Sequence, residues 1–174
     1  AIAVRGDQGV RVAKPVAFKK LAWNLLRRIK ENETYPVFSK YGTSIYLPYY
    51  NQVGKSVARN AQQIGGIEYI DNFSMEKMEQ YQRKNEACYG CPIHCKREFE
   101  VKKGKFAGLR GHGLEFCILS SHGPACGNSN IDSIFKINNI CNEYGICSDT
   151  SGLVLAAAFE WYEHGLITKE DTGG

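Results

Sequence analysis

The stretch that decides the fold is "NEACYGCPIHCKREFE", residues 85–100, which places Cys88, Cys91 and Cys95 within eight residues. The glycine and the proline between these cysteines allow tight turns, so that three sulfurs can surround one point on a loop. Iron–sulfur clusters are held by such thiolates, usually three close in sequence and one distant. The next cysteine is Cys117. The stretch therefore predicts a metal-binding loop that needs a ligand from elsewhere.

The spacing of the three cysteines leaves other kinds of site open. A structural zinc ion takes four ligands, often as two separated pairs. His94 is the nearest additional donor, but residues 94 and 95 are neighbours and would be awkward ligands of one tetrahedral ion. A nucleophilic cysteine needs one thiol beside a base rather than three thiols. The spacing favours an iron–sulfur cluster over zinc and over inert or redox-active thiols.

The composition is that of a globular domain: 174 residues, 43% hydrophobic and 23% charged. The odd number of cysteines, seven, indicates reduced thiols in the cytoplasm rather than a secreted disulfide framework. No apolar run is long enough for a membrane span, and the N-terminus does not resemble a signal peptide. A net charge of +4 is too small to indicate a nucleic-acid partner.

Basic residues gather near the cysteines in the sequence. The segment from Arg83 to Arg110 contains eight basic and three acidic residues, a net charge of +5, while the rest of the chain sums to −1. A solvated hairpin face would explain this pattern. Alternatively, the basic residues offset an anionic thiolate cluster or receive an acidic electron carrier.

The periodicity predicts a mainly α-helical fold with a small β-hairpin. Residues 1–12 are expected to form a short hairpin, and Ser74 and Asn130 are expected to cap helices. Glycine-rich residues 108–113 are expected to be a loop, and Thr168 resembles the N-cap of a further helix, which suggests that the chain is a fragment. The expected helices are 15–29, 43–54 with a kink at Pro48, 75–84, 114–121, 131–144 ended by Gly145, and 152–163, and the expected hairpin is 97–106 with its turn at Lys103-Gly104.

The segment "RKNEACYGCPIHCKR", residues 83–97, resembles the cluster-binding segment of the aldehyde:ferredoxin oxidoreductase family of tungsten- or molybdenum-pterin enzymes. The resemblance covers essentially the whole chain, because weaker similarities follow in the family's order. They include "YGTS" (41–44), "GLEF" (113–116), "IFKINNICNEYGI" (134–146) and "ITKEDTGG" (167–174).

The resemblance implies a domain arrangement. Members of this family are several times longer and begin with a β-rich domain that cradles two pterins, followed by two largely helical domains. Residues 1–12 would then end the β-rich domain, and residues 13–174 would form most of the helical second domain, incomplete at its C-terminus. The family's fourth cluster cysteine, in an Asp-x-x-Gly-Leu-Cys motif, would lie beyond residue 174.

The same resemblance assigns roles to individual residues. Cys88, Cys91 and Cys95 take the positions of [4Fe-4S] ligands. A second set matches a family motif, Asp-x-x-Gly-Leu-(Asp/Cys), that contacts pterin, although its first residue is Asn rather than Asp here. These residues are Asn142, Gly145, Ile146 and Cys147. From the residues alone, this stretch would be an ordinary helix end with a glycine cap and a buried cysteine.

A departure from the family pattern occurs at Cys117. Many members carry "GPEYET", whose second Glu lies near the metal, whereas this chain has "GLEFCI" with Glu115 kept and Cys117 in the second position. A thiolate is a poor proton carrier but a good soft ligand for tungsten or molybdenum. The tungsten subunits of class II benzoyl-CoA reductases are similar in using a cysteine ligand. Otherwise, Cys117 would be a small buried apolar residue.

The resemblance implies an oxidoreductase with a tungsten or molybdenum bis-pterin and a [4Fe-4S] cluster, which oxidises aldehydes and passes electrons to ferredoxin or an electron-transfer subunit. Reduction of an aromatic acyl-CoA is the second expectation, motivated by Cys117, and a non-enzymatic electron-transfer module is the third. His112 with Arg110 could bind an anion, and His122 could approach the metal pocket. Homo- or hetero-oligomerisation stays open.

Overall fold

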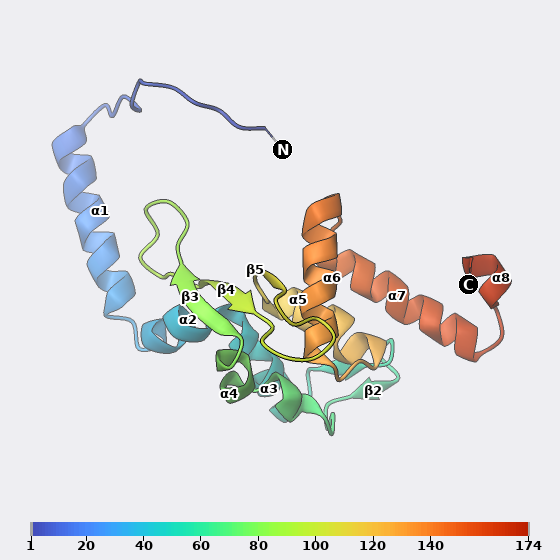
Figure 1. The fold of residues 1–174 in the computed structure, drawn as a ribbon. Helices are drawn as coiled ribbons and strands as arrows, with labels where there is room; N and C mark the ends of the chain where they lie inside the picture. The colour runs from blue at the N-terminus through green and yellow to red at the C-terminus, as the bar shows by residue number, and fades with distance from the viewer. Residues whose placement is uncertain (1, 174) are drawn as a thin grey trace.

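A computed structural model describes residues 2–173 as a predominantly helical chain with two small antiparallel sheets (Figure 1). The predicted mainly α-helical fold is confirmed. The elements are α1 (Pro15–Lys30), α2 (Tyr35–Tyr41), η1 (Gly42–Ile45), α3 (Tyr46–Gln52), β1 (Val57–Ala58), β2 (Gln63–Ile64), η2 (Ile70–Phe73), α4 (Met75–Glu79), β3 (Gln82–Glu86), β4 (Lys96–Glu100), β5 (Arg110–His112), α5 (Phe116–His122), η3 (Pro124–Cys126), α6 (Ile131–Tyr144), α7 (Ser148–Glu163) and α8 (Lys169–Thr172).

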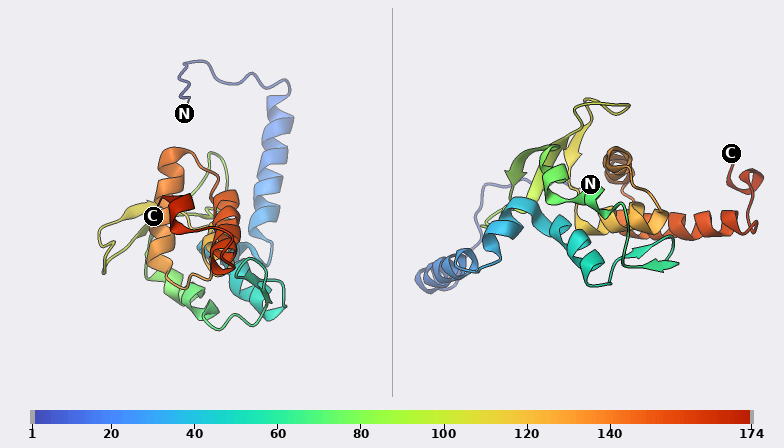
Figure 2. Two further views of the ribbon diagram at one scale, coloured as in Figure 1. Left: turned by 90° about the vertical axis from the view of Figure 1, so that its right-hand side faces the viewer. Right: turned by 90° about the horizontal axis from the view of Figure 1, so that it is seen from below.

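The N-terminal segment differs from its prediction. Residues 2–12 form no strand, and each of them is exposed, so the predicted hairpin is wrong for the part of 1–12 that is described. A two-stranded hairpin is marginal unless one face is covered, and residues 2–12 pack against no other layer. Helix α1 follows as predicted, and its N-terminal end projects away from the rest of the molecule (Figure 2).

The predicted helix 43–54 is divided into η1 and α3. Pro48 lies in the first turn of α3, where its missing N–H removes no intrahelical hydrogen bond, so Pro48 is accommodated without interrupting α3. Gly42 at the start of η1 has a φ of +59°. A Cβ there would lie 2.7 Å from the Cys95 carbonyl oxygen and would also collide with the Arg97 guanidinium. Gly42 therefore lets β4 approach this turn closely.

The segment before the cysteines is largely a strand rather than a helix. Ser74 caps α4 by accepting a hydrogen bond from the Lys77 N–H, as predicted, but α4 ends at Glu79 and residues 82–86 form β3. The predicted helix 75–84 is therefore too long. Pairing of β3 with β4 supplies backbone hydrogen-bond partners that local helix propensity does not anticipate.

The three-stranded sheet has the order β3-β4-β5, with antiparallel pairing throughout. The predicted hairpin is present but longer than expected: β4 pairs with β5 across the connection 101–109, which contains Lys103-Gly104. Strand β4 also pairs with β3 on its other side. Strand β5 lies within the stretch 108–113 that was expected to be a loop. The cysteine stretch forms the connection between β3 and β4.

The sheet packs on α6 through aromatic side chains. The Phe99 and Phe135 rings lie 4.0 Å apart between centroids, and the Tyr81 and Phe135 rings 4.8 Å apart. Both phenylalanines are almost fully buried. Burial of such aromatic side chains contributes several kcal/mol, on the order of 2–3 for each. This packing fixes the sheet, and therefore the base of the cysteine loop, against α6.

The C-terminal helices follow the sequence signals closely. Asn130 caps α6 by accepting hydrogen bonds from Asp132 and Ser133, and Gly145 ends it with a left-handed φ of +68°. Helix α7 begins at Ser148, earlier than predicted, and packs on α5. Thr168 starts α8, where its backbone N–H donates to the Asp171 carboxylate at 2.8 Å. No helix in residues 2–173 has the length and apolar character needed to cross a bilayer.

Candidate metal and cofactor site

The cysteine loop carries its three thiols on one short connection. Cys88 is exposed, and Cys91 and Cys95 are partly buried. The Cys91 N–H donates to the Cys88 carbonyl at 3.0 Å, which turns the loop back on itself. Partial burial raises the pKa of the Cys95 thiol, with smaller contributions from Glu115, Cys91 and Cys88. The three thiols are therefore electrostatically coupled.

The described part of the chain contains no group of three or more His, Cys, Asp or Glu side chains already gathered around one metal position. The chemistry of the cysteine-loop thiols fits an iron–sulfur cluster, because thiolates are the usual cluster ligands and three come from one loop. That Cys88, Cys91 and Cys95 are cluster ligands remains a prediction.

Residues distant in sequence hold the start and the middle of the cysteine loop. The Tyr35 hydroxyl donates to the Pro92 carbonyl at 3.0 Å. The Asn85 side-chain amide donates to the Ser39 carbonyl at 2.6 Å. Both contacts connect the loop to α2, so that the end of β3 and the turn around Pro92 have fixed positions.

The basic residues of the sheet lie opposite acidic ones. Arg83 pairs with Glu98 and Glu100, Lys84 pairs with Glu86, and Arg110 pairs with Glu100 at 2.9 Å. These exposed pairs lie along the strands and occupy much of the positive charge that was counted around the cysteines. The interpretation of this segment as a solvated sheet face accounts for them.

A second feature is a hollow of about 580 Å³ beside the sheet. It contains three of the sequence-predicted residues, Glu115, Cys117 and Asn142. Cys147 is the N-cap of α7, directly before Ser148, which lines the hollow. The full lining is Lys96, Gly111, His112, Gly113, Glu115, Cys117, Ile118, Asn138, Asn139, Asn142, Glu143 and Ser148. Gly145 and Ile146 are not part of the lining.

Glu115 is the N-cap residue of α5, and two other side chains hold its carboxylate in place. The Thr43 hydroxyl donates to its carboxylate and accepts a hydrogen bond from the Phe116 N–H at 2.9 Å. The Arg97 guanidinium lies 3.9 Å from the other carboxylate oxygen. These contacts fix the direction of Glu115 at the edge of the hollow.

Arg97 connects the two features. It is only 3% exposed, although it lies on a strand with a charged sequence. Its guanidinium donates to the carbonyl oxygens of Tyr41, of Cys95 at 3.2 Å and of Leu114 at 2.6 Å. Arg97 thus joins the last cysteine of the loop to the segment that carries Glu115.

Cys117 and Cys147 are both exposed, but their thiol pKa values are shifted in opposite directions. Partial burial of the Cys117 thiol raises its pKa, and the negative charges of Asp149 and Glu115 add to the rise. Hydrogen bonds from the Thr150 hydroxyl and from the N–H groups of Thr150 and Asp149 lower the pKa of Cys147. Cys117 is therefore not the small buried residue that was the alternative interpretation, and Cys147 is not buried.

Two of the histidines considered from the sequence, His112 and His122, lie next to side chains of the protein itself. His112 lines the hollow, and its Nδ1 lies 3.1 Å from Glu86, while Arg110 pairs with Glu100, so the two do not form an anion-binding loop. His122 is 2% exposed, and its Nε2 lies 3.0 Å from the Ser151 hydroxyl. Burial lowers its pKa. His122 does not line the hollow.

Comparison with known proteins decides the family. A family model described as aldehyde ferredoxin oxidoreductase, domains 2 and 3, matches residues 20–174. The chain belongs to the aldehyde ferredoxin oxidoreductase family. A tungsten-containing aldehyde ferredoxin oxidoreductase of Pyrococcus abyssi is 33% identical over 180 residues, which cover 100% of this chain and 28% of that protein. The corresponding protein of Thermococcus kodakarensis is 32% identical over 178 residues, covering 99% and 28%.

A more distant relative is the WOR-like subunit of an aliphatic sulfonate oxidoreductase from Pyrococcus furiosus, 28% identical over 91 residues. That match covers 52% of this chain and 15% of the relative. The chain therefore spans about 28% of the length of its aldehyde ferredoxin oxidoreductase relatives. The division of the chain between residues 12 and 13 remains a prediction.

Within this family member, sequence analysis missed two residues that organise the site, Arg97 and Thr43. Arg97 was counted only as one of the eight basic residues near the cysteines. Thr43 lies in the "YGTS" segment, which was noted only as a weak similarity. Asn138 was also missed, and its side-chain amide donates to the His112 carbonyl at 2.7 Å beside the hollow. The available signal in the sequence was the position of Asn138 among apolar residues on one face of the helix.

Proposed function

We propose that this chain is part of a tungsten- or molybdenum-pterin oxidoreductase with a [4Fe-4S] cluster, which oxidises aldehydes to carboxylic acids and passes the electrons to ferredoxin. Family membership supports this class of reaction. The names of the Pyrococcus abyssi and Thermococcus kodakarensis relatives support tungsten, an aldehyde substrate and ferredoxin.

One observation of the structure carries the proposal. Cys95 and Glu115 lie on either side of the buried Arg97, which donates a hydrogen bond to the Cys95 carbonyl and faces the Glu115 carboxylate. The cysteine loop and the hollow therefore adjoin, although 20 residues separate Cys95 from Glu115 in the sequence. An enzyme that removes two electrons at one centre and releases them singly from another needs such proximity.

The chain's own residues have separate tasks in this proposal. Cys88, Cys91 and Cys95 supply three thiolates to the cluster. Bound beside the hollow, a metal pterin supplies the two-electron oxidation, and the cluster supplies one-electron transfer. Asn142 and Cys147, at the adjoining ends of α6 and α7, offer polar contacts at the hollow edge to a pterin.

Glu115 and Arg97 position the reacting region. The carboxylate of Glu115 is directed by Thr43 and Arg97, so it can accept a hydrogen bond from a group in the hollow. Arg97 brings a positive charge between the anionic thiolates and this carboxylate, which reduces their mutual repulsion. The burial of Arg97 makes this interaction less sensitive to salt than an exposed pair would be.

Cys117 favours a second candidate function, the reduction of an aromatic acyl-CoA. Its thiol lines the hollow where a carboxylate stands in many family members, and a thiolate is a soft metal ligand. Assays of the full-length protein with aldehydes and with aromatic acyl-CoA substrates separate the two. Electron-donor-dependent consumption of acyl-CoA, without aldehyde oxidation, would replace the first proposal.

Metal analysis of anaerobically purified full-length protein tests the first proposal. We expect about four iron atoms and one tungsten or molybdenum atom per chain. Cys95→Ser should lower the iron content, because a hydroxyl is a poor cluster ligand. Cys126→Ser is the matched control: Cys126 donates to the carbonyl oxygens of Ser121 and Gly152, and a hydroxyl can do the same. Zinc as the only bound metal would reject the proposal.

A further inference from the structure

The charge of the chain is concentrated in its N-terminal part. Residues 1–30 contain eight basic residues and one acidic residue, a net charge of +7, so the rest of the chain sums to −3. Helix α1 contributes five of the basic residues and no acidic one. The strongest single-sign charge therefore lies on α1 rather than on the sheet, where the basic residues are paired with glutamates.

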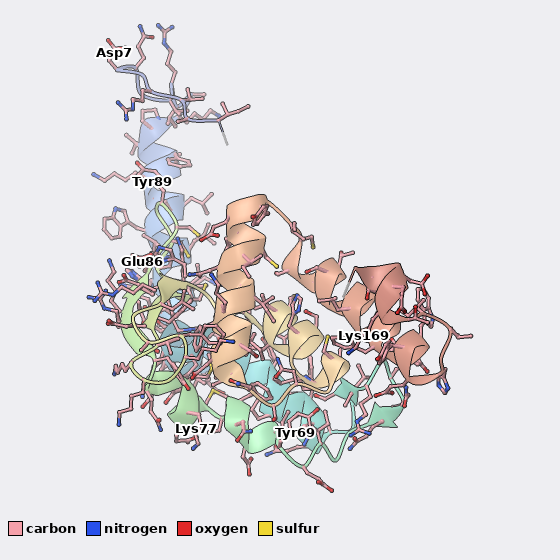
Figure 3. All side chains as sticks on the ribbon, turned by 45° about the vertical axis from the view of Figure 1, so that its right-hand side comes forward. Asp7, Tyr69, Lys77, Glu86, Tyr89 and Lys169 are labelled. Carbon is pink, nitrogen blue, oxygen red and sulfur yellow. The ribbon has the colours of Figure 1, made fainter. Side chains whose placement is uncertain are left out.

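Helix α1 brings this charge next to the cysteine loop. A hollow of about 480 Å³ lies between them. Its lining is Trp23, Leu26, Arg27, Lys30 and Glu31 on one side and Gly90, Cys91 and Pro92 of the cysteine loop on the other. Residues 27 and 91 are remote in sequence. Figure 3 shows Tyr89 at the tip of the loop beside α1, and this side chain is fully exposed.

The two sides of α1 differ in character. Leu25 and Ile29 face a separate hollow of about 460 Å³, whose lining also includes Phe38, Ile93 and one basic residue of α1, Arg28. The apolar stripe at the C-terminal end of α1 is thus turned toward the body of the molecule. Arg27 and Lys30 line the other hollow, and Arg27 has only a long contact of 3.9 Å to the exposed Glu31. The basic side is therefore available to a partner.

We propose that Trp23, Arg27, Lys30 and Tyr89, together called the α1–loop face, form the docking surface for an acidic protein that carries one electron at a time. This proposal rests on the proposed function, because it takes Cys91 as a cluster ligand. In the transfer, the reduced cluster loses one electron and the docked carrier gains it.

Three properties of the α1–loop face fit such a partner. First, Cys91 lines the same hollow as Arg27, so a carrier seated there comes close to the sulfur of the proposed cluster. Second, Arg27 and Lys30 together outweigh the one acidic residue of this hollow, Glu31, and a net positive charge attracts an acidic protein from a distance and orients it on arrival. Third, Trp, Tyr and Arg are the side chains that most often anchor protein interfaces.

Binding measurements on the cofactor-loaded full-length protein test this proposal. An acidic ferredoxin is titrated into the wild type and into the double variant Arg27→Glu/Lys30→Glu at low ionic strength. We expect the double variant to bind at least about tenfold more weakly, and wild-type binding to weaken steeply with added salt. The matched control, Lys102→Glu/Lys103→Glu, makes the same charge change on an exposed loop of the sheet and should bind ferredoxin as the wild type does.

A kinetic readout separates this proposal from the proposed function. Aldehyde-dependent reduction of benzyl viologen, a small dication that needs no protein docking surface, reports the activity of each variant. In the double variant, the KM for ferredoxin should rise, while the rate of viologen reduction should stay at the wild-type value. Absence of aldehyde-dependent viologen reduction in the wild type would count against the proposed function alone.

Three results would overturn the docking proposal. They are equal ferredoxin affinity of the double variant and the wild type, an equal loss in the control, and the absence of ferredoxin binding to the wild type at low ionic strength. Salt-sensitive binding of the wild type to anionic phospholipid vesicles without ferredoxin binding would assign the basic side of α1 to a membrane surface instead.

Discussion

At the scale of single residues, Arg97 has the greatest influence on the site. We predict that Arg97→Lys lowers the free energy of unfolding by about 2 kcal/mol, because one ammonium cannot reach the Tyr41, Cys95 and Leu114 carbonyls together. Arg97→Ala should cost about 3–5 kcal/mol, since it also leaves buried acceptors without donors. Urea-induced unfolding of the purified protein measures both.

The control for this prediction is Arg110→Lys. Arg110 is largely exposed and pairs with Glu100 at the sheet edge, so its replacement should leave the unfolding midpoint nearly unchanged. A midpoint for Arg97→Lys as high as that of Arg110→Lys would show that Arg97 is not the anchor described here.

The two exposed thiols near the hollow allow a second prediction. In the cofactor-free protein at about pH 8, iodoacetamide should modify Cys147 faster than Cys117, because the thiolate is the reactive form and the two pKa values are shifted in opposite directions. Thr150→Ala removes the hydrogen bond of 3.4 Å to the Cys147 sulfur and should raise its pKa, which slows alkylation below that pKa.

Mass spectrometry of alkylated peptides over a range of pH measures these rates. Cys126 is the internal reference, because burial raises its pKa to about 11 and keeps it protonated at about pH 8. Faster modification of Cys117 than of Cys147, or no effect of Thr150→Ala, would contradict the ionisation states described.

The residue scale also shows what the sequence can predict about the site. Glu115 and Cys117 share a hollow with Asn142, as their family positions suggested. The proximity of Cys95 to Glu115 was not predictable, because it depends on the pairing of β4 with β5 and on the burial of Arg97. A charged residue on an alternating strand is normally exposed. Only tertiary structure shows that this one is buried.

At the scale of secondary structure, the contact between α5 and α7 depends on Gly152. A Cβ on this residue would lie 2.6 Å from the side chain of Ser121 and 2.7 Å from its carbonyl carbon. We predict that Gly152→Ala destabilises the protein by about 1–3 kcal/mol, because the backbone of α5 would have to move. Thermal or urea-induced unfolding measures the loss.

Val154→Ala, on the same helix at a position 62% exposed, is the matched control and should change stability little. Ala156, one turn after Gly152, is also buried. Equal stability of the two variants would show that the α5–α7 contact is looser than described.

The elements that local signals define were predictable, and those that depend on distant partners were not. Ser74, Asn130 and Gly145 act through hydrogen bonds or backbone conformation within a few residues, and each has the predicted role. Strand β3 exists because β4 pairs with it across the cysteine loop. Residues 2–12 have no such partner within the described chain, so the apolar residues there form no strand.

At the scale of the whole molecule, the family resemblance predicts that the cluster site depends on more polypeptide than this chain. The chain spans about 28% of the length of its relatives, and the family resemblance implies a fourth cysteine ligand beyond residue 174. We predict that residues 1–174, reconstituted anaerobically with iron and sulfide, lose their iron to a chelator at least about tenfold faster than the full-length protein. A three-thiolate cluster has one iron open to attack.

Iron release followed by absorbance, together with electron paramagnetic resonance of the reduced samples, measures this difference. Cys91→Ser in both lengths is the control, because loss of a loop thiolate should weaken each cluster. Equal chelator resistance of the two wild-type lengths would show that a cysteine within residues 1–174 completes the ligand set. Cys117 would then be the first candidate, because Glu115, two residues before it, adjoins Cys95 and Arg97.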